Sequence, residues 1–148
     1  VFNLSITQPE IIDRTHGNMA EWYHPDGGDW RRRDMPRTVM VFLNDDPALS
    51  EDEQDKAARA QAEKGLSAYW TALQGTLDPA KVDRAATNAL IGSPGTIAQQ
   101  VADRFHPEDR LMLWFDFFNH DSEQVIGMMR SFKEKVAPAV EKLTGGAR

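Results

Sequence analysis

Two short apolar runs limit what this chain can fold into. Residues 38–43 (TVMVFL) and 111–118 (LMLWFDFF) are apolar at nearly every position, so each would be apolar on both faces of an extended chain. Strands of this kind are typical of parallel sheets that helices cover on both sides. The sequence therefore predicts an α/β protein that contains these two runs as buried parallel strands.

The segments that follow the apolar runs carry the start signals of helices. Residues 50–53 (SEDE) form a capping-box pattern ahead of an apolar stripe with helical spacing. Ser93 and Pro94 are suited to the N-cap and the first position of a second helix. Asp121 is suited to begin the last helix, whose regular hydrogen bonding should break near Pro138. Helices that alternate with buried strands support the α/β prediction.

The other segments have weaker patterns. Residues 1–6 (VFNLSI) have the composition of a strand, and residues 76–90 are ambiguous. Residues 14–37 are rich in Gly, Pro, Asp and Arg, which predicts a long loop or lid. Residues 144–148 predict a flexible tail. We expect one domain over residues 1–148, because a chain of this length suits a single core.

The composition excludes several classes of protein. Apolar residues make up 41% of the 148 residues and charged residues 27%, as in an ordinary globular domain. The formal net charge of −6 argues against nucleic acid as the main partner. No apolar run is long enough to span a bilayer, so we expect no membrane insertion. The absence of cysteine excludes disulfides and thiol chemistry and agrees with a cytoplasmic location.

Common catalytic and metal-binding motifs are absent from the sequence. It holds no G-x-G-x-x-G, no Walker A motif and no G-x-S-x-G. The histidines show neither i,i+4 pairing nor an acidic partner at ligand spacing, so we expect no metal site. These histidines are His16, His24, His106 and His120.

Three features of the carboxyl-terminal half occur in a fixed order. A Gly-Ser-Pro helix start occupies residues 92–94, an apolar strand follows at 111–118, and the last helix contains Phe132 and a Val-Ala-Pro at 136–138. This order and spacing resemble the end of the bacterial-luciferase-like flavin-dependent monooxygenases. With the preceding strand and helix, the resemblance extends over residues 37–143.

The sequence also departs from the family pattern at two places. Gly95-Thr96 stands where the family usually has acidic residues after the Ser-Pro. Residues 44–46 (NDD) stand where many members have an Ala-Asp-Thr-like turn. These differences leave the subfamily and the substrate open.

The resemblance implies a TIM-type (β/α)₈ barrel of parallel strands that alternate with helices. Such a barrel needs roughly 250 residues, so this chain would supply its carboxyl-terminal portion, about three of the eight strands. The rest of the barrel or a partner chain would complete it, and an uncovered strand edge would favour an oligomer.

The resemblance also implies an enzyme, a monooxygenase that uses reduced FMN, or F420 in a sister branch, and O2 to oxidise a small organic substrate. Two alternatives remain open at this point. The chain is a non-enzymatic flavin-binding or structural subunit derived from the same fold, or it is an unrelated small α/β domain with an exposed sheet edge.

In such barrels the active site lies at the carboxyl ends of the strands. The resemblance therefore implies a cofactor or substrate pocket at residues that end the two strands. These are Asn44, Asp45, Trp114, Asp116, Phe117 and Asn119. Met112, Trp114 and Asp116 would share one face of their strand. A buried carboxylate needs a partner, so Asp116 either pairs within the barrel wall or hydrogen-bonds substrate or flavin.

The long predicted loop offers two further candidates. Trp22, Tyr23 and His24 would form a lid that excludes water from the flavin, or else pack as an ordinary surface loop. Residues 31–33 (RRR) would meet a cofactor phosphate, or else form a solvated charged face. The sequence does not identify a catalytic base.

Overall fold

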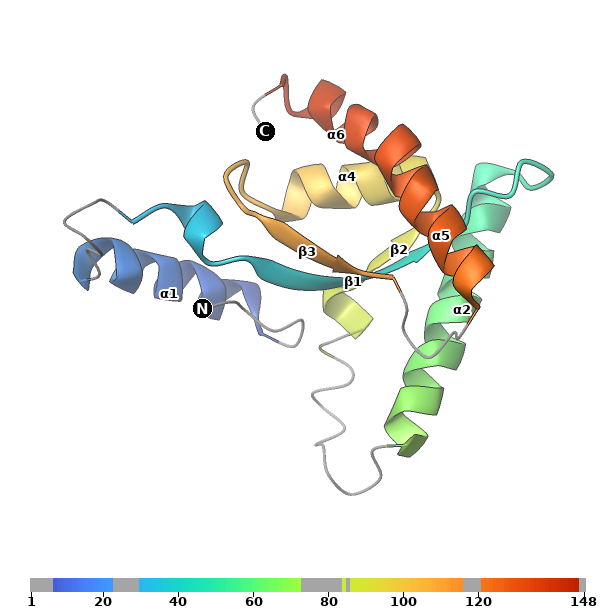
Figure 1. Ribbon diagram of the computed structural model, residues 1–148, viewed down its shortest axis with the longest axis horizontal. Helices are drawn as coiled ribbons and strands as arrows, with labels where there is room; N and C mark the ends of the chain where they lie inside the picture. The colour runs from blue at the N-terminus through green and yellow to red at the C-terminus, as the bar shows by residue number, and fades with distance from the viewer. Residues whose placement is uncertain (1–6, 23–29, 73–83, 85, 116–120, 147–148) are drawn as a thin grey trace.

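A three-stranded parallel sheet forms the centre of the structure (Figure 1). The computed structural model describes residues 7–22, 30–72, 84, 86–115 and 121–146. The strands lie in the order β2-β1-β3 and are β1 (Arg37–Leu43), β2 (Leu90–Gly92) and β3 (Leu111–Trp114). In the central strand, Val41 lies opposite Leu90 of β2 and Met40 lies opposite Trp114 of β3. The predicted parallel α/β class is confirmed.

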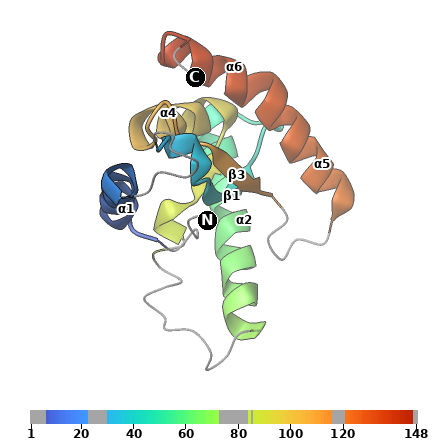
Figure 2. The ribbon, with the colours of Figure 1, turned by 60° about the vertical axis from the view of Figure 1, so that its left-hand side comes forward.

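Helices cover the sheet on both faces, as Figures 1 and 2 show. The main helices are α1 (Pro9–Trp22), α2 (Glu51–Ala72), α4 (Pro94–Arg104), α5 (Ser122–Ser131) and α6 (Ala137–Leu143). A short 3₁₀ turn, η2 (Arg32–Asp34), precedes β1, and a π-helical turn, η3 (Phe132–Val136), joins α5 to α6.

Alternate side chains of β1 support two separate hydrophobic layers. Val39, Val41 and Leu43 pack into a cluster with α4, α5, η3 and α6. Met40 and Phe42 point the other way, into a smaller cluster with α2. All five are at most 4% exposed. This double burial explains why residues 38–43 lack the apolar–polar alternation of a half-exposed strand.

The two crossover connections place β2 and β3 on opposite edges of β1. From β1 the chain passes through α2 to β2 on one edge, and from β2 it passes through α4 to β3 on the other edge. Figure 2 shows α2 on one face of the sheet and α4, α5 and α6 on the opposite face. In a (β/α)₈ barrel, strands pair in chain order and the helices form one outer ring. The described residues therefore form an open parallel sheet, and a barrel is not seen.

The helix starts that the sequence predicts are confirmed. The carboxylate of Glu53 accepts hydrogen bonds from the backbone N–H and the hydroxyl of Ser50. Ser93 caps α4 by accepting from Thr96 N, and Asp121 caps α5 by accepting from Gln124 N. The predicted break near Pro138 is also confirmed, because the π-helical turn lies directly before α6.

The predicted burial of β3 on both faces is wrong for residues 111–114. Leu111, Leu113 and Phe115 pack against the larger cluster, but Met112 is 45% exposed and Trp114 42% exposed. The cause is the position of β3 at the edge of the described sheet. Helix α2 contacts β2 and β1, and Met112 and Trp114 on this face of β3 stay partly exposed.

The prediction of a loop over residues 14–37 is wrong for residues 14–22, which belong to α1. Pro9 occupies the first helical position, and Ile12 and His16 are buried one turn apart on the inner face. Residues 23–29 lie outside the described residues. Trp30 follows them and donates from Nε1 to His16 Nδ1 at 3.3 Å.

Short segments at other places were missed or cannot be compared. Strand β2 was not predicted, because it has only three residues and follows a helical turn at 86–88. The predicted strand at residues 1–6 lies outside the described residues. Within the predicted tail, the amide and hydroxyl of Thr144 both donate to Val140 O, and residues 147–148 lie outside the described part.

An ion network ties together the segments at the amino ends of the strands. The Asp109 side chain is 1% exposed and accepts from Arg32 Nε at 2.8 Å and from Arg37 Nη1 at 3.1 Å. Arg32 also bonds Asp13 of α1 at 3.0 Å. Burial alone would raise the pKa of Asp109, but the hydrogen bonds and charges of the two arginines hold this pKa below its usual value. Residue 32 of the arginine run thus has a structural role.

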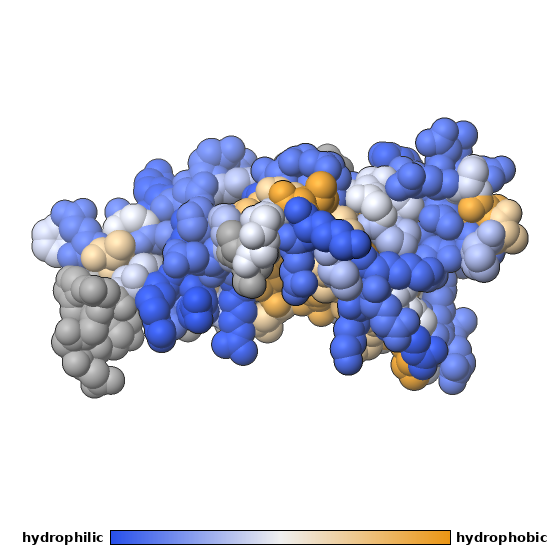
Figure 3. Space-filling model, turned by 90° about the horizontal axis from the view of Figure 1, so that it is seen from above, coloured by the Kyte–Doolittle hydropathy of each residue, from blue (hydrophilic) through white to orange (hydrophobic). Residues whose placement is uncertain are grey.

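The outer surface over α4 and α6 is mostly hydrophilic, with small hydrophobic patches (Figure 3). This is the surface expected of amphipathic helices that bury only their inner stripe. Among the described helices, none is both long and apolar enough to cross a membrane.

Truncation of the larger core cluster should be costly. Ile97 is fully buried, and we expect Ile97→Ala to lower the free energy of unfolding by about 2–5 kcal/mol through lost transfer energy and a residual cavity. Ile126→Ala is the matched control, because Ile126 is 46% exposed on α5 and its loss should change stability by less than about 0.5 kcal/mol. Urea unfolding of both variants measures the difference, and equal losses would contradict the placement of this core.

The Asp109 network should make stability depend on acid. Because the folded pKa of Asp109 lies below the unfolded value, its contribution is present above pH about 4 and is lost as pH falls through the folded pKa. Asp109→Asn should cost about 3 kcal/mol at neutral pH, the scale of a broken buried ion pair, and should flatten the stability curve below pH about 4.

Urea unfolding at stepped pH values tests this, with Asp103→Asn on the exposed side of α4 as control. An Asp109→Asn variant that keeps the acid slope of the unchanged protein would contradict the assignment. His16 affects stability at a higher pH than Asp109 does. Burial and then the charge of Arg32 lower its pKa, so its contribution to the free energy of unfolding is lost as pH falls below about 6.5.

Candidate functional site

The carboxyl ends of the strands lie along one edge of the sheet, where parallel α/β proteins bind ligands. Asn44 and Asp45 follow β1 directly, as predicted from the sequence. The amide of Asn44 donates to Gly92 O at 3.2 Å and so extends the pairing with β2. The residues that end β1 and those that begin α4 are therefore neighbours at this edge.

Asn44 uses its side chain to shape the loop after β1. Its Oδ1 accepts from Asp46 N at 3.1 Å, and Asp46 Oδ1 in turn accepts from Ala48 N at 2.9 Å. Gln54 of α2 donates to Asp46 O at 2.8 Å and anchors the same loop. These bonds give Asn44 a structural role and leave its side-chain NH2 group as the part that a ligand can contact.

Asp45 joins this loop to the last helical segment. Its carboxylate accepts from Lys135 Nζ at 2.7 Å, with both side chains partly exposed. Burial alone would raise the pKa of Asp45, but the hydrogen bond and charge of Lys135 help to hold it below its usual value. Asp45 is therefore an ionised, paired carboxylate at neutral pH and is not poised to take up a proton.

Two acidic side chains of α2 occupy the amino end of α4. Asp55 accepts from Ser93 N at 2.6 Å and from the Thr96 hydroxyl at 2.8 Å. Glu51 accepts from the Ser93 hydroxyl at 3.1 Å. A helix amino terminus after a parallel strand is a usual place for a phosphate. Here the protein's own carboxylates fill that place.

Glycine is required where these carboxylates approach the backbone. Gly92 has a φ of +147°, and a Cβ there would lie 2.7 Å from Asp55 Oδ1 and 2.7 Å from Thr96 Cγ2. A Cβ on Gly95 would collide with the Glu51 carboxylate. The Gly-Ser-Pro-Gly sequence therefore allows α2 and α4 to meet closely.

Trp114 ends β3 and lies opposite Met40, short of the carboxyl end of β1. It is 42% exposed and shares a face with Met112. The alternation of faces predicted for this strand is confirmed from Leu111 to Phe115. Asp116, Phe117 and Asn119, the other predicted site residues, lie outside the described residues.

The predicted lid does not reach this edge within the described residues. Trp22 ends α1 and is 78% exposed. Figure 1 shows α1 beyond the amino ends of the strands, at the far side of the molecule from the loop after β1. Tyr23 and His24 lie outside the described residues. Of the arginine run, Arg31 pairs with Asp34, Arg32 joins the Asp109 network, and Arg33 is exposed.

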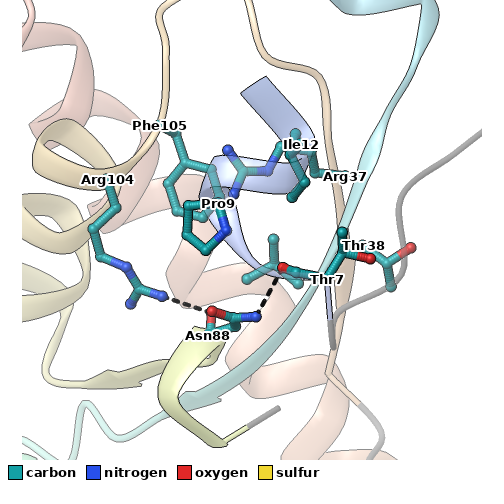
Figure 4. Close-up of a pocket in the computed structure, with 9 residues that line it drawn as sticks. Thr7, Pro9, Ile12, Arg37, Thr38, Asn88, Arg104 and Phe105 are labelled. Carbon is teal, nitrogen blue, oxygen red and sulfur yellow. Dashed lines mark hydrogen bonds between the residues drawn. The ribbon is translucent and has the colours of Figure 1, made fainter. Parts of the chain in front are cut away.

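A cavity at the opposite edge was not predicted from the sequence. It has a volume of about 200 Å³ and lies at the amino end of β1, against Arg37 and Arg104 (Figure 4). A possible signal is Arg37 itself, a charge at the start of an otherwise apolar strand. Among the described residues, no group of His, Asp and Glu is arranged to hold a metal ion.

The fold and the two edges define an α/β protein with a parallel sheet and helices on both faces. Comparison of the chain with protein-family models, with curated proteins and with solved structures finds no match. At its carboxyl edge the described part of the chain offers an exposed indole, a polar loop and paired charges, which suit binding of a flat, partly apolar group.

The close approach at Gly92 predicts opposite effects for two glycine substitutions. Gly92→Ala should lower the free energy of unfolding by roughly 2–4 kcal/mol, because it adds backbone strain and displaces Asp55. Gly127→Ala should raise it by about 0.5–1 kcal/mol, because Gly127 lies within α5 with no atom near its Cβ position. Thermal and urea unfolding compare the two. A neutral Gly92→Ala would contradict the contact between α2 and α4.

Proposed function

We propose that this chain forms part of a luciferase-like flavin-dependent monooxygenase and supplies carboxyl-terminal β/α units of its barrel. The features behind the resemblance fall at matching structural positions, which supports the proposal. The Gly-Ser-Pro lies at the junction of β2 and α4, the apolar run contains β3, and the break in the last helix precedes Pro138.

The observation that carries the proposal is the bare face of β3. Met112 and Trp114 are each more than two-fifths exposed, and in the described part of the sheet β3 pairs with a strand on one edge only. Parallel strands are normally covered on both faces and paired with neighbours. Helices α4, α5 and α6 lie on the other face of β3, as outer helices of a barrel would. Further strands would then turn Met112 and Trp114 toward the barrel interior.

The proposal also requires a rearrangement. In a barrel β2 and β3 would be neighbours and α2 would share the outer face with α4. In this sheet β1 lies between β2 and β3, and α2 covers the other face. Pairing with additional strands has to supply the free energy for this exchange of neighbours.

The bound flavin, FMN or F420, would supply the redox chemistry, with O2 as oxidant and a small organic molecule as substrate. The protein would bind and orient the flavin and exclude water. Trp114 would contact the flat ring, and the loop at Asn44 and Asp45 would line the pocket rim. Asp116, Phe117 and Asn119 stay assigned to the same pocket on the basis of the resemblance. In the described part of the sheet β3 is an edge strand, which favours assembly with another chain.

A second candidate is a flavin-binding protein without turnover, and the strand order favours it. The order β2-β1-β3 makes a topological switch point between the neighbouring strands β1 and β3. The helix that follows β1, α2, lies on one face of the sheet, and the helix that follows β3, α5, lies on the other. Open parallel sheets bind ligands at such a point, at the carboxyl ends of the strands. The same residues, Asn44, Asp45 and Trp114, lie there.

Titration of FMN and of F420 into the chain, followed by flavin fluorescence, separates the two candidates. The monooxygenase proposal expects no saturable binding by the chain alone, because the chain would supply only part of the barrel that encloses the flavin. A polypeptide extended by the coding sequence upstream should bind flavin and oxidise its reduced form. Stoichiometric binding by the chain alone would favour the second candidate. Failure of both polypeptides to bind either flavin would refute both.

Two exposed tryptophans provide a matched test of the pocket in whichever polypeptide binds flavin. Trp114→Ala should weaken flavin binding by about three- to tenfold, the scale of one aromatic contact. Trp22→Ala should leave binding unchanged, because α1 lies at the opposite edge. Dissociation constants from the fluorescence titration measure both effects. A larger loss for Trp22→Ala would favour the lid interpretation and contradict the placement of the pocket.

A further inference from the structure

The cavity at the amino edge of the sheet is built from four segments that are distant in sequence. Arg37 and Thr38 begin β1, Asn88 precedes β2, Arg104 ends α4, and Thr7 lies just before α1. Helix α4 runs back from the carboxyl edge, and this brings its last residue to the amino ends of the strands. Figure 4 shows these side chains around the same space.

The cavity carries an excess of positive charge. Two guanidinium groups line it, and none of its lining residues is acidic. Both groups lie near the Phe105 ring, with Arg37 Cζ 4.6 Å and Arg104 Cζ 5.8 Å from its centroid. The closest counter-charge is Asp109, which Arg37 shares with Arg32. One carboxylate therefore serves two arginines, and Arg104 has no acidic partner among the described residues.

The two arginines differ in what holds them. Arg104 donates to three backbone carbonyls, those of Thr87, Asn88 and Ala89, at 2.8 to 3.1 Å. These carbonyls are uncharged, so they fix the position of the guanidinium without neutralising its positive charge. Arg37 is 9% exposed and donates from Nη1 to Asp109. In the described part of the chain, its Nε and Nη2 donate to no protein acceptor, and neither atom is fully buried, so an acceptor from solution can reach them.

Arg104 lies at the surface, but partial burial of its guanidinium and then the charge of Arg37 lower its pKa. An anion placed near both groups would relieve this repulsion. Guanidinium groups suit such a ligand, because their planar donors match the oxygens of carboxylates and phosphates.

The volume restricts the size of the ligand. About 200 Å³ is smaller than the roughly 300–1,000 Å³ of pockets that bury drug-sized ligands, so a flavin ring is excluded. The space suits a phosphate ion or a small carboxylic acid. Thr7 also lines the cavity, and its hydroxyl can add a neutral hydrogen bond.

We propose that this cavity is a binding site for a small oxyanion, a phosphate or a carboxylate, which Arg37 and Arg104 hold at the amino ends of the strands. The site lies at the opposite edge of the sheet from the candidate flavin pocket. Its occupancy would tie α1, β1, β2 and α4 together and stabilise the fold. The proposal does not depend on the flavin proposal, so either can fail alone.

Calorimetric titration of inorganic phosphate, acetate and succinate into the 148-residue chain tests the site, with chloride at matched ionic strength as reference. We expect saturable binding of at least one oxyanion and a rise in the melting temperature beyond that in chloride. Binding of phosphate alone, or of the carboxylates alone, would show which kind of oxyanion the site accepts. Absence of any binding or stabilisation beyond chloride would overturn the proposal.

Arginine variants locate the binding. Arg104→Gln should weaken the oxyanion affinity about ten- to hundredfold, the scale of a charge-assisted hydrogen bond. Arg130→Gln is the control, since it removes the same charge from an exposed position on α5. Equal losses in both variants would mean non-specific screening and would refute the site. Arg37→Gln is a further variant, and if it fails to fold, the comparison of Arg104→Gln with Arg130→Gln decides alone.

Discussion

The double burial of β1 is the constraint on which the rest of the structure depends. This strand is hydrogen-bonded to a neighbour on each edge and supplies side chains to the hydrophobic layer on each face. Val41 and Met40, adjacent in sequence, face opposite layers and are at most 1% exposed. Its two ends also anchor both functional edges, because Arg37 enters the amino-edge cavity and Asn44 begins the carboxyl-edge loop. A change in β1 would therefore be felt at both candidate sites.

Local signals in the sequence predicted the elements that depend on local interactions. The caps at Ser93 and Asp121 act within three residues, and the apolar run of β1 reflects burial by whatever surrounds it. The strand order depends on contacts between distant segments, and no local pattern encodes it. Helix α1 was missed because Gly17, Asn18 and the turn-forming residues that follow obscured the spacing of Ile12 and His16. The exposure of Trp114 depends on the place of β3 at the edge of the described sheet, which is a property of the tertiary fold.

The candidate sites divide in the same way. The position of Asn44 and Asp45 at the end of β1 could be predicted, because a parallel sheet places the end of every strand at one edge. The partners of these residues could not, since Lys135 lies ninety positions along the chain from Asp45. The cavity at Arg37 and Arg104 is wholly a product of the tertiary fold. Arg104 has no sequence context that distinguishes it from an ordinary surface charge, and Arg37 is marked only by its place at the start of an apolar strand.

The contact of Asp55 and Glu51 with the start of α4 also couples the folding of two helices. The amide of Ser93 donates to Asp55, a partner on another helix, instead of to water. Any fluctuation that detaches α2 would remove Asp55 from the start of α4 and expose Gly92 and the end of β2. The two helices should therefore open together as one cooperative unit, and the amide of Ser93 should exchange its hydrogen at the rate at which α2 undocks. The amino end of α4, a position where parallel α/β proteins often bind phosphate, thus joins the helices on the two faces of the sheet.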